Sequence, residues 1–248
     1  GRGAVSNASG RFDHEERFPV DDGWWELEED VAAKLTTEIM PDFTKSLISR
    51  NSSPDISFDR SINPYKGCEH GCIYCFARPT HSYLSLSPGL DFETKIFFKD
   101  NAAAILEKEL RQPGYKCKPI AIGVNTDAYQ PAEKEYEITR SILEVLSAYN
   151  HPVSIITKSS RILRDLDILA PMGQKNLAHV MISVTTLESS LARTMEPRAS
   201  RPSNRLATIK ELNDAGVPTG VLAAPIIPAI NDSELETILE ASVESGAF

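Results

Sequence analysis

Residues 61–81 read SINPYKGCEHGCIYCFARPTH, and within this stretch Cys68, Cys72 and Cys75 form the spacing CxxxCxxC. Three thiolates on one tight loop suit a compact cluster of several irons in which each iron takes one cysteine. A [4Fe–4S] cube normally takes four cysteines. Three ligands would therefore leave one iron with an open coordination position, which is what separates a catalytic metal site from a structural one.

A structural zinc site is a second interpretation of the same stretch, with Cys68, Cys72, Cys75 and His70 as its ligands. Zinc sites of this kind usually pair two separated couples of ligands rather than three crowded cysteines. His70 also lies inside the loop, where reaching the same metal would strain the backbone. A zinc-stabilised binding module on an α/β scaffold is therefore the weaker alternative, from another functional class.

The composition is that of a soluble globular chain with enough apolar residues for a sizeable core. Of the 248 residues, 41% are hydrophobic and 25% are charged, close to the averages for globular proteins. No apolar run reaches the roughly 18 to 20 residues that a membrane helix needs, so no membrane contact is expected. The formal net charge of -9 has the wrong sign for general attraction to a phosphate backbone. A nucleic-acid partner is therefore possible but not favoured.

The fourth cysteine, Cys117, stands apart from the other three, which does not suit a disulfide framework. No signal-peptide pattern opens the chain. We therefore expect a cytoplasmic protein whose clustered thiols stay reduced and free to bind metal. The chain opens on Gly1 rather than Met, and Phe248 directly follows a helical pattern. Both ends look truncated, so we expect the core of a longer protein.

Two regions are predicted along the chain. Residues 1–57 are rich in Gly, Ser, Asn and Asp, so we expect an irregular N-terminal arm packed on the core through Trp24 and Trp25. From residue 58 to residue 248, strand-like and helix-like stretches alternate. The expected strands are short apolar runs near residues 62–65 and over residues 120–124, 153–157, 179–184 and 218–223.

Helical periodicity lies between these strands, at residues 138–149 and again at residues 206–212. Gly216 is expected to end the second of these helices. Ser233 and Glu236 have the spacing of a capping box that would open a last helix, which Gly246 would close. Alternation at this spacing predicts a parallel sheet, and at least five strands fit a complete or partial (β/α) barrel. A doubly wound open sheet is the alternative, and in either fold ligands lie at the carboxyl ends of the strands.

The motif CxxxCxYC after the first core strand of such a chain resembles that of the radical S-adenosylmethionine (SAM) enzymes. The resemblance runs from Ile62 to the end of the chain, and residues 61–81 are similar to the subgroup related to spore photoproduct lyase. It implies a partial (β/α) barrel of the radical SAM type, a [4Fe–4S] cluster on the three cysteines, and SAM chelating the open iron. A reductant such as a flavodoxin or ferredoxin would supply one electron. The cofactor would then yield a 5′-deoxyadenosyl radical that abstracts hydrogen from an unknown substrate.

Several side chains at the expected strand ends are candidates for binding this cofactor. The resemblance places Tyr74 near the adenine, through a backbone contact, and a ring packed under the cluster loop is the alternative. Asn125, Thr126 and Asp127 follow a strand where the family often has a Gly-Gly-Glu-like motif, so they could accept hydrogen bonds from the ammonium group of SAM. Helix N-capping by Asp127 is the competing interpretation.

Two further pairs of candidates lie on later strands. Ser183 and Thr185 are two residues apart, so alternation puts their hydroxyls on one face. Buried hydroxyls need partners, and either the cofactor ribose or a neighbouring strand would supply them. Lys158 and Arg198 follow the third and fourth core strands, where each could bind a carboxylate or phosphate of the cofactor or substrate. An ordinary loop salt bridge is the alternative for both.

One departure from the subgroup concerns the reaction itself. Photoproduct lyases place a hydrogen-donating cysteine just after the second core strand, where this chain has Asn125. Cys117 precedes that strand and is expected at the opposite end. We therefore predict that the chain does not repair thymine photoproducts by that route and acts on another molecule, with lyase-like DNA repair as the alternative.

Overall fold

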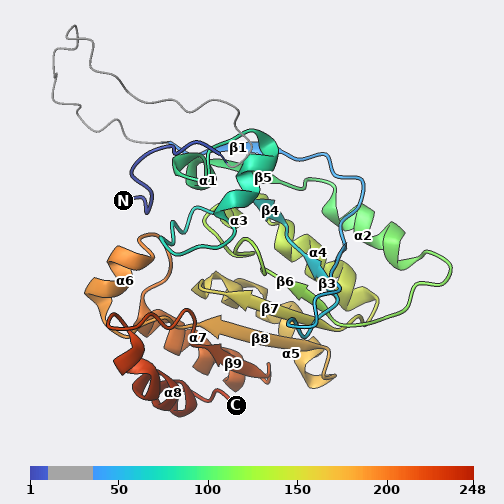
Figure 1. The fold of residues 1–248 in the computed structure, drawn as a ribbon. Coiled ribbons are helices and arrows are strands. Elements are labelled where there is room, and N and C mark those ends of the chain that lie inside the picture. The colour runs from blue at the N-terminus through green and yellow to red at the C-terminus, as the bar shows by residue number, and fades with distance from the viewer. Residues whose placement is uncertain (11–35) are drawn as a thin grey trace, which may run out of the picture.

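The computed structural model describes residues 1–10 and 36–248. Trp24 and Trp25, which were expected to hold the arm on the core, lie outside the described residues. The described chain forms a six-stranded sheet, a three-stranded sheet and a layer of helices (Figure 1). None of the described helices is both long enough and apolar enough to cross a membrane.

The main sheet has the strand order β2-β3-β6-β7-β8-β9. All neighbours from β3 to β9 pair in parallel, and β2 is an antiparallel edge strand on β3. The strands are β2 (Ser49–Arg50), β3 (Arg60–Ile62), β6 (Ile120–Ile122), β7 (Val153–Thr157), β8 (Ala178–Ser183) and β9 (Thr219–Leu222). The predicted parallel sheet is confirmed, and its carboxyl ends lie along one edge because parallel strands share a direction.

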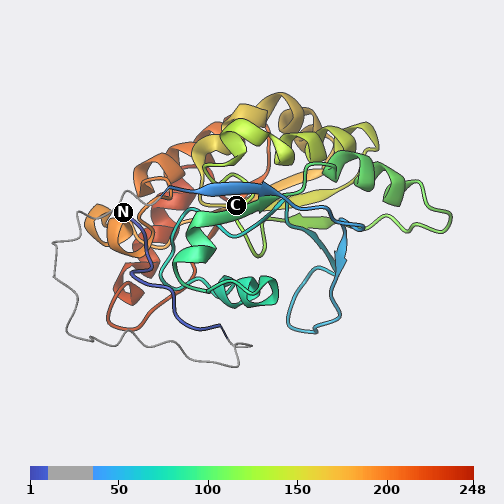
Figure 2. The same cartoon turned by 90° about the horizontal axis from the view of Figure 1, so that it is seen from above.

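Helices cover one face of this sheet, as Figure 2 shows. The principal ones are α2 (Ala102–Leu110), α4 (Ile138–Ala148), α5 (Leu166–Gln174) and α7 (Pro202–Asp214). In β7, alternate residues from Val153 are buried while Ser154 and Ile156 are only half-buried. The buried set joins the side chains of α4, including Ile142, in one hydrophobic core. This burial of one sheet face on amphipathic helices is the main source of stability that the sequence pattern predicts.

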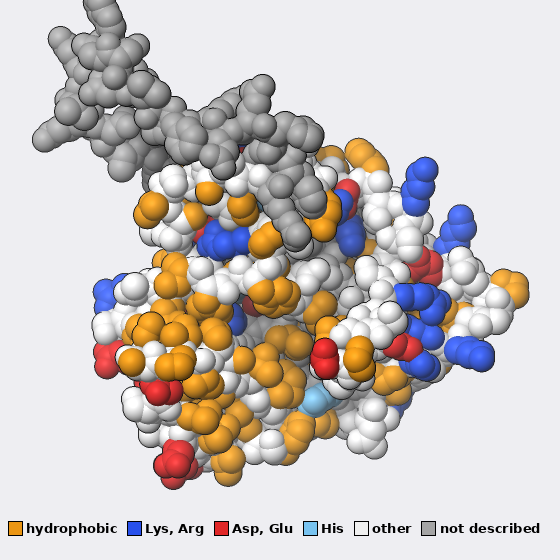
Figure 3. Space-filling model, viewed as in Figure 1, with side chains coloured by type: hydrophobic (Ala, Val, Ile, Leu, Met, Phe, Trp, Pro, Cys, Tyr) orange, Lys and Arg blue, Asp and Glu red, His pale blue; other side chains and the backbone are white. Residues whose placement is uncertain are grey.

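The opposite face of the main sheet is less covered. Figure 3 shows hydrophobic side chains gathered on this face over the lower strands of the sheet, β7 to β9. The remaining helices are η1 (Arg78–Leu84), α1 (Leu90–Thr94), α3 (Glu133–Tyr136), η2 (Ser160–Asp165), α6 (Ser189–Met195), η3 (Asp232–Glu234) and α8 (Leu235–Glu244). The helices η1 and α1 follow the cysteine stretch directly.

The second sheet corrects two expectations. It has the order β1-β5-β4, with β1 (Glu38–Pro41), β5 (Lys95–Phe98) and β4 (Tyr65–Lys66). The strand expected near residues 62–65 is therefore two strands in different sheets, because Pro64 between β3 and β4 lacks a backbone N–H. The region of residues 1–57 is not wholly irregular either, since β1 pairs in parallel with β5. Its division from the core as a separate region stays a prediction.

The predicted ends of two helices are confirmed, and one predicted beginning is wrong. Gly216 and Gly246 follow α7 and α8 with φ of +80° and +97°, a backbone conformation that suits glycine. The capping box of Ser233 and Glu236 does not form, because residues 232–234 are a 3₁₀ turn and α8 begins only at Leu235, with no side-chain cap.

Candidate active site at the carboxyl ends of the strands

The cysteine loop follows β4 and is held by backbone hydrogen bonds to distant segments. Cys68 N donates to Phe92 O at 2.9 Å, and Ile73 N donates to Met195 O at 3.0 Å. Gly67 has φ +79°, and a Cβ there would approach the backbone oxygen of Phe92 to 2.9 Å. Glycine is therefore required at this turn for two independent reasons, conformation and space.

The three clustered thiols are free and largely shielded from solvent. Cys68 and Cys72 are buried and Cys75 is half-buried, whereas Cys117 is exposed. Burial, with a smaller contribution from the Cys75 thiol, raises the pKa of Cys72 to about 12. Burial also raises the pKa of Cys68, and the Cys72 thiol adds to that effect. Three soft, unpaired sulfur donors therefore converge on one loop, and this donor set fits an iron–sulfur cluster.

The same loop was also considered as a mononuclear zinc site. Among residues 1–10 and 36–248, no three His, Cys, Asp or Glu side chains are grouped so that they could hold one metal ion. A cube that takes one cysteine per iron does not need its three sulfurs to share one atom. The fourth zinc ligand proposed from sequence, His70, is engaged elsewhere, with Nδ1 3.4 Å from Oδ2 of Asp127.

A buried polar cluster lies beside the cysteine loop, at the ends of β7 and β8. Lys158 Nζ donates to Ser183 Oγ at 2.6 Å and lies 3.4 Å from Oε1 of Glu196. Thr185 donates to the same Glu196 oxygen at 2.8 Å. The Tyr74 hydroxyl also bonds Glu196. Three candidates from the sequence, Lys158, Thr185 and Tyr74, therefore meet at a carboxylate that sequence reasoning missed, and Ser183 joins them through Lys158.

Glu196 is held as an anion by two cations. The guanidinium of Arg205, on α7, bonds its second oxygen, and both side chains are almost fully buried. Burial alone would raise the pKa of Glu196, but the charges of Lys158 and Arg205 outweigh it and hold that pKa at about 2. Burial, followed by Cys72 and Glu196, raises the pKa of Tyr74 above its ordinary value, so the phenol stays protonated. The cluster is thus a fixed arrangement of paired charges.

Neither Glu196 nor Arg205 stood out in the sequence. Arg205 follows the first turn of a helix with many polar residues, where an arginine is normally solvated. Glu196 lies two residues before Arg198, and that charged run suggested only a loop salt bridge. The tertiary fold alone buries the pair.

The three consecutive candidates after β6, residues 125–127, make different contacts. Asn125 is exposed, and its backbone N–H donates to Asn63 Oδ1 at 2.9 Å. Thr126 is buried, and its hydroxyl donates to Tyr65 O at 2.8 Å. Asp127 is half-buried, with its side chain only 9% exposed, and accepts from the Thr157 hydroxyl at 2.6 Å. The structure therefore commits two of the three side chains to protein contacts and leaves the amide of Asn125 exposed.

Asp127 is a junction between the cysteine loop and the strand ends. Besides Thr157, it accepts from the backbone N–H of Lys158 at 2.8 Å and of Tyr129 at 2.9 Å. The charge of His70 and these hydrogen bonds lower the pKa of Asp127 despite its burial, which acts in the opposite direction. The N-cap interpretation is wrong, because the next helix, α3, begins only at Glu133.

Arg198 forms the loop salt bridge that was its alternative interpretation. Its guanidinium lies 3.0 Å from Glu69 Oε1, and its backbone N–H donates to His70 O at 3.1 Å. Arg198 therefore clamps the segment between the first two cysteines to the loop after α6.

The fold and this site define a class of protein. A model of the radical SAM superfamily matches residues 62–241, and the chain belongs to that superfamily, whose members use a [4Fe–4S] cluster and S-adenosylmethionine. The family, the partial barrel and the two cofactors expected from sequence are thereby confirmed. The zinc-module alternative is set aside.

Two relatives in sequence are uncharacterized proteins. One from Mycobacterium tuberculosis is 39% identical over 194 residues, which are 77% of this chain and 57% of that protein. One from Methanocaldococcus jannaschii is 28% identical over 173 residues, 70% of this chain and 62% of that protein. The chain thus spans less than two thirds of the length of these relatives.

Solved structures share the fold at low identity. A mutant of spore photoproduct lyase superposes with a TM-score of 0.63 at 18% identity, covering 85% of this chain and 58% of that one. Streptococcus suis SuiB bound to S-adenosylmethionine superposes with a TM-score of 0.53 at 15% identity, covering 86% of this chain and 39% of that one. At such identities the likeness establishes the fold and says nothing of the substrate.

Proposed function

We propose that this chain is the catalytic core of a radical SAM enzyme in which Cys68, Cys72 and Cys75 each bind one iron of a [4Fe–4S] cluster. The observation that carries the proposal is the presence of three free thiols on one loop beside a buried polar group of side chains at the strand ends. When bound, the cluster and SAM supply a one-electron reductive cleavage that yields a radical able to abstract hydrogen from a substrate. The chain itself positions the cofactors and shields them from water.

The proposed cofactor-facing residues are Asn125, Lys158, Ser183, Thr185 and Tyr74. The register of the sheet supports this grouping. Thr157 pairs with Ile182 across β7 and β8, so the next residues, Lys158 and Ser183, are level and point to the same side. Their contact of 2.6 Å places a cation and a hydroxyl together, and this pair suits a carboxylate such as that of SAM.

Thr126, Asp127 and Arg198 act in this proposal as positioning residues rather than as direct ligands of the cofactor. Their side chains bond Tyr65, the end of β7 and Glu69 respectively, outside the group of side chains around Glu196. Asp127 lies 3.4 Å from the His70 ring and the backbone N–H of Arg198 donates to His70 O, so both hold the segment between the first two cysteines. A preorganised loop lowers the cost of ordering three ligands around one cluster.

We propose a substrate other than a thymine photoproduct in DNA. Spore photoproduct lyase has been solved with a dinucleoside spore photoproduct, but its 19% identity to this chain carries the fold alone. Asn125 stands where the subgroup places its hydrogen-donating cysteine, and the net charge of -9 opposes general attraction to DNA. A flavodoxin or ferredoxin in a reducing cytoplasm is the proposed electron source.

The test is reconstitution of the chain with iron and sulfide under anaerobic conditions, followed by reduction with dithionite. Addition of SAM should change the electron paramagnetic resonance spectrum of the reduced cluster, and 5′-deoxyadenosine should form even without substrate. A reducible cluster whose spectrum is indifferent to SAM would overturn the proposal. The spectrum is the primary readout because it does not depend on turnover.

A further inference from the structure

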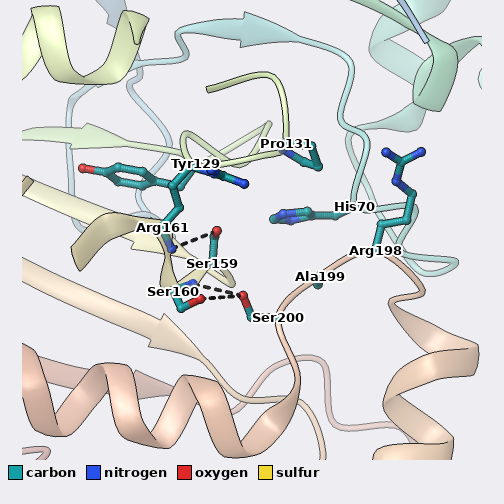
Figure 4. A pocket seen from close by; sticks show the side chains of 9 residues that line it. All are labelled: His70, Tyr129, Pro131, Ser159, Ser160, Arg161, Arg198, Ala199 and Ser200. Carbon is teal, nitrogen blue, oxygen red and sulfur yellow. Dashed lines mark hydrogen bonds between the residues drawn. The ribbon is translucent and has the colours of Figure 1, made fainter. Parts of the chain in front are cut away.

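A polar pocket of about 270 Å³ lies beside the cysteine loop. It is distinct from the buried group of Lys158, Ser183 and Glu196 described above, none of which lines it. The pocket is open to solvent and is lined by His70 of the cysteine loop, by Tyr129 and Pro131, by residues 159–161 after β7 and by residues 198–200 before α7. Figure 4 shows the His70 ring and the side chains of Ser159, Ser160 and Ser200 around one space, while the guanidinium of Arg198 turns away.

The pocket and the group of side chains around Glu196 are reached from two consecutive residues after β7. Lys158 and Ser159 are consecutive, and their side chains diverge. Lys158 Nζ reaches Ser183 at 2.6 Å, whereas Ser159 Oγ accepts from the backbone N–H of Arg161 at 3.3 Å. A ligand of the pocket would therefore be separate from the proposed cofactor.

The charge of the pocket is positive, although the chain as a whole is acidic. No Asp or Glu is among the residues that line it. Among the described residues Arg161 has no ion pair or side-chain hydrogen bond, and its buried Nε lacks any partner. Arg198 is already compensated by Glu69 at 3.0 Å. The uncompensated positive charge at this pocket is therefore that of Arg161, and a half-buried guanidinium without a partner is costly unless an anion binds it.

Hydroxyl groups supply further donors around the same space. Ser160 N donates to Ser200 Oγ at 3.0 Å, and the two hydroxyl oxygens lie 3.3 Å apart. One proton of that pair remains available after they bond each other, and the proton of Ser159 is available as well. The carboxylate of Asp127, 3.4 Å from the His70 ring, does not line the pocket and uses its oxygens on Thr157 and backbone amides. It therefore does not compete for this space.

We propose that this pocket binds the phosphate group of a ligand, with Arg161 as the charged anchor and Ser159, Ser160 and Ser200 as hydroxyl donors. A phosphate offers several acceptor oxygens in different directions, and donors on two separate loops match that shape better than they match a planar carboxylate. The site lies against His70, between the first two cysteines, so a bound phosphate would sit next to the cysteine loop. The inference does not depend on the cluster being present.

The test is calorimetric titration of the chain, with and without reconstituted cluster, using inorganic phosphate, adenosine 5′-monophosphate and acetate as probes. The chain should bind phosphate or the nucleotide saturably, and Arg161→Gln should weaken that binding at least about tenfold. Arg111→Gln is the matched control, because the Arg111 side chain, directly after α2, is 67% exposed and does not line the pocket. Preference for one probe identifies free phosphate or a phosphorylated molecule as the source.

A second measurement keeps the proposal independent of any effect on folding. Phenylglyoxal modifies accessible arginines, and peptide mapping resolves Arg161 from Arg198. Inorganic phosphate should protect Arg161 from modification and leave Arg111 unaffected. Absence of saturable binding, equal binding of acetate, or binding and protection that ignore Arg161→Gln would each overturn the assignment.

Discussion

The carboxylate of Glu93 accepts a hydrogen bond of 2.9 Å from the backbone N–H of Gly3, a residue ninety positions earlier in the chain. Glu93 is completely buried, and it also accepts from the N–H of Ala4 at 2.8 Å and from Arg78 at 2.6 Å. Arg78 in turn donates to the carbonyl of Cys72 at 2.8 Å. The first residues of the chain are therefore tied to the cysteine loop through one buried carboxylate.

Gly3→Ala should loosen the cysteine loop. A Cβ at Gly3 would lie 1.8 Å from the backbone oxygen of Gly71. Because that oxygen belongs to the backbone, the clash can be relieved only if the two segments move apart. The hydrogen bonds from residues 3 and 4 to Glu93 would be lost, leaving a buried carboxylate short of donors, at a cost of about 1–3 kcal/mol. Hydrogen exchange of residues 67–75 should rise, and iron should leave a reconstituted cluster faster in the presence of a chelator. Gly1→Ala, where a Cβ meets nothing within 4 Å, is the control.

Replacing any one of Cys68, Cys72 and Cys75 with Ala should abolish cluster assembly, because two of the four irons would then have no cysteine ligand. Cys117→Ala should leave assembly unchanged, since Cys117 is exposed and precedes β6. Iron and sulfide content with visible absorbance measures both effects. A full cluster in the variant that lacks Cys72 would refute the ligand assignment.

Glu196→Gln should make the free energy of unfolding depend less on pH in the acid range. The folded chain holds the pKa of Glu196 at about 2, below the ordinary 4.5. A carboxyl whose pKa is lowered by folding stabilises fully above its unfolded pKa, and this contribution disappears as the pH falls from about 4.5 to about 2. The full shift is worth on the order of 3 kcal/mol.

Urea unfolding of the metal-free chain across this pH window measures the effect. The stability difference between the parent chain and Glu196→Gln should shrink as the pH falls, whereas the exposed Glu135→Gln should show no such trend. Parallel curves for the parent and the Glu196 variant would show that the buried charge cluster does not act as described.

Lys158→Met should weaken binding of SAM to the reduced cluster. The variant removes the cation that lies on Ser183 and would face the carboxylate of the cofactor, while Arg205 still pairs Glu196. The SAM concentration needed to change the paramagnetic resonance spectrum should rise at least about tenfold. Lys175→Met is the matched control, because Lys175 is exposed and its ammonium bonds the exposed side chain of Asn150, away from the strand-end site. An unchanged midpoint in Lys158→Met would remove Lys158 from the cofactor site.

The reconstituted protein should not return thymine from an oligonucleotide that carries the spore photoproduct. Asn125 cannot donate hydrogen to a product radical as a thiol does, and Cys117 lies before β6, at the opposite end of the strand. Incubation with SAM and reductant, followed by chromatography of the thymines, checks this expectation. SAM-dependent repair at enzyme-like turnover would restore the alternative.

The sequence by itself determined the features that depend on local spacing. The CxxxCxYC stretch identified the family and its cofactors, and the apolar runs placed the parallel strands from residue 120 onward to within two residues. Gly216 and Gly246 marked two helix ends, because a glycine with positive φ after an amphipathic stretch is a local signal. The capping box at Ser233 failed because tertiary contacts of Glu234 with Thr186 and Leu187 shaped that turn instead.

Only the tertiary structure decided which distant groups meet. Tyr74 and Glu196 are 122 residues apart, Gly3 and Glu93 are 90 apart, and the phosphate pocket joins three loops. No periodicity links such pairs, because their proximity follows from the order of strands in the sheet and not from neighbours along the chain. The sequence therefore specified the thiols, while the packing of strand ends selected which carboxylate, cation and hydroxyls surround them. That selection rests on burial, which makes an unpaired charge too costly to leave without a partner.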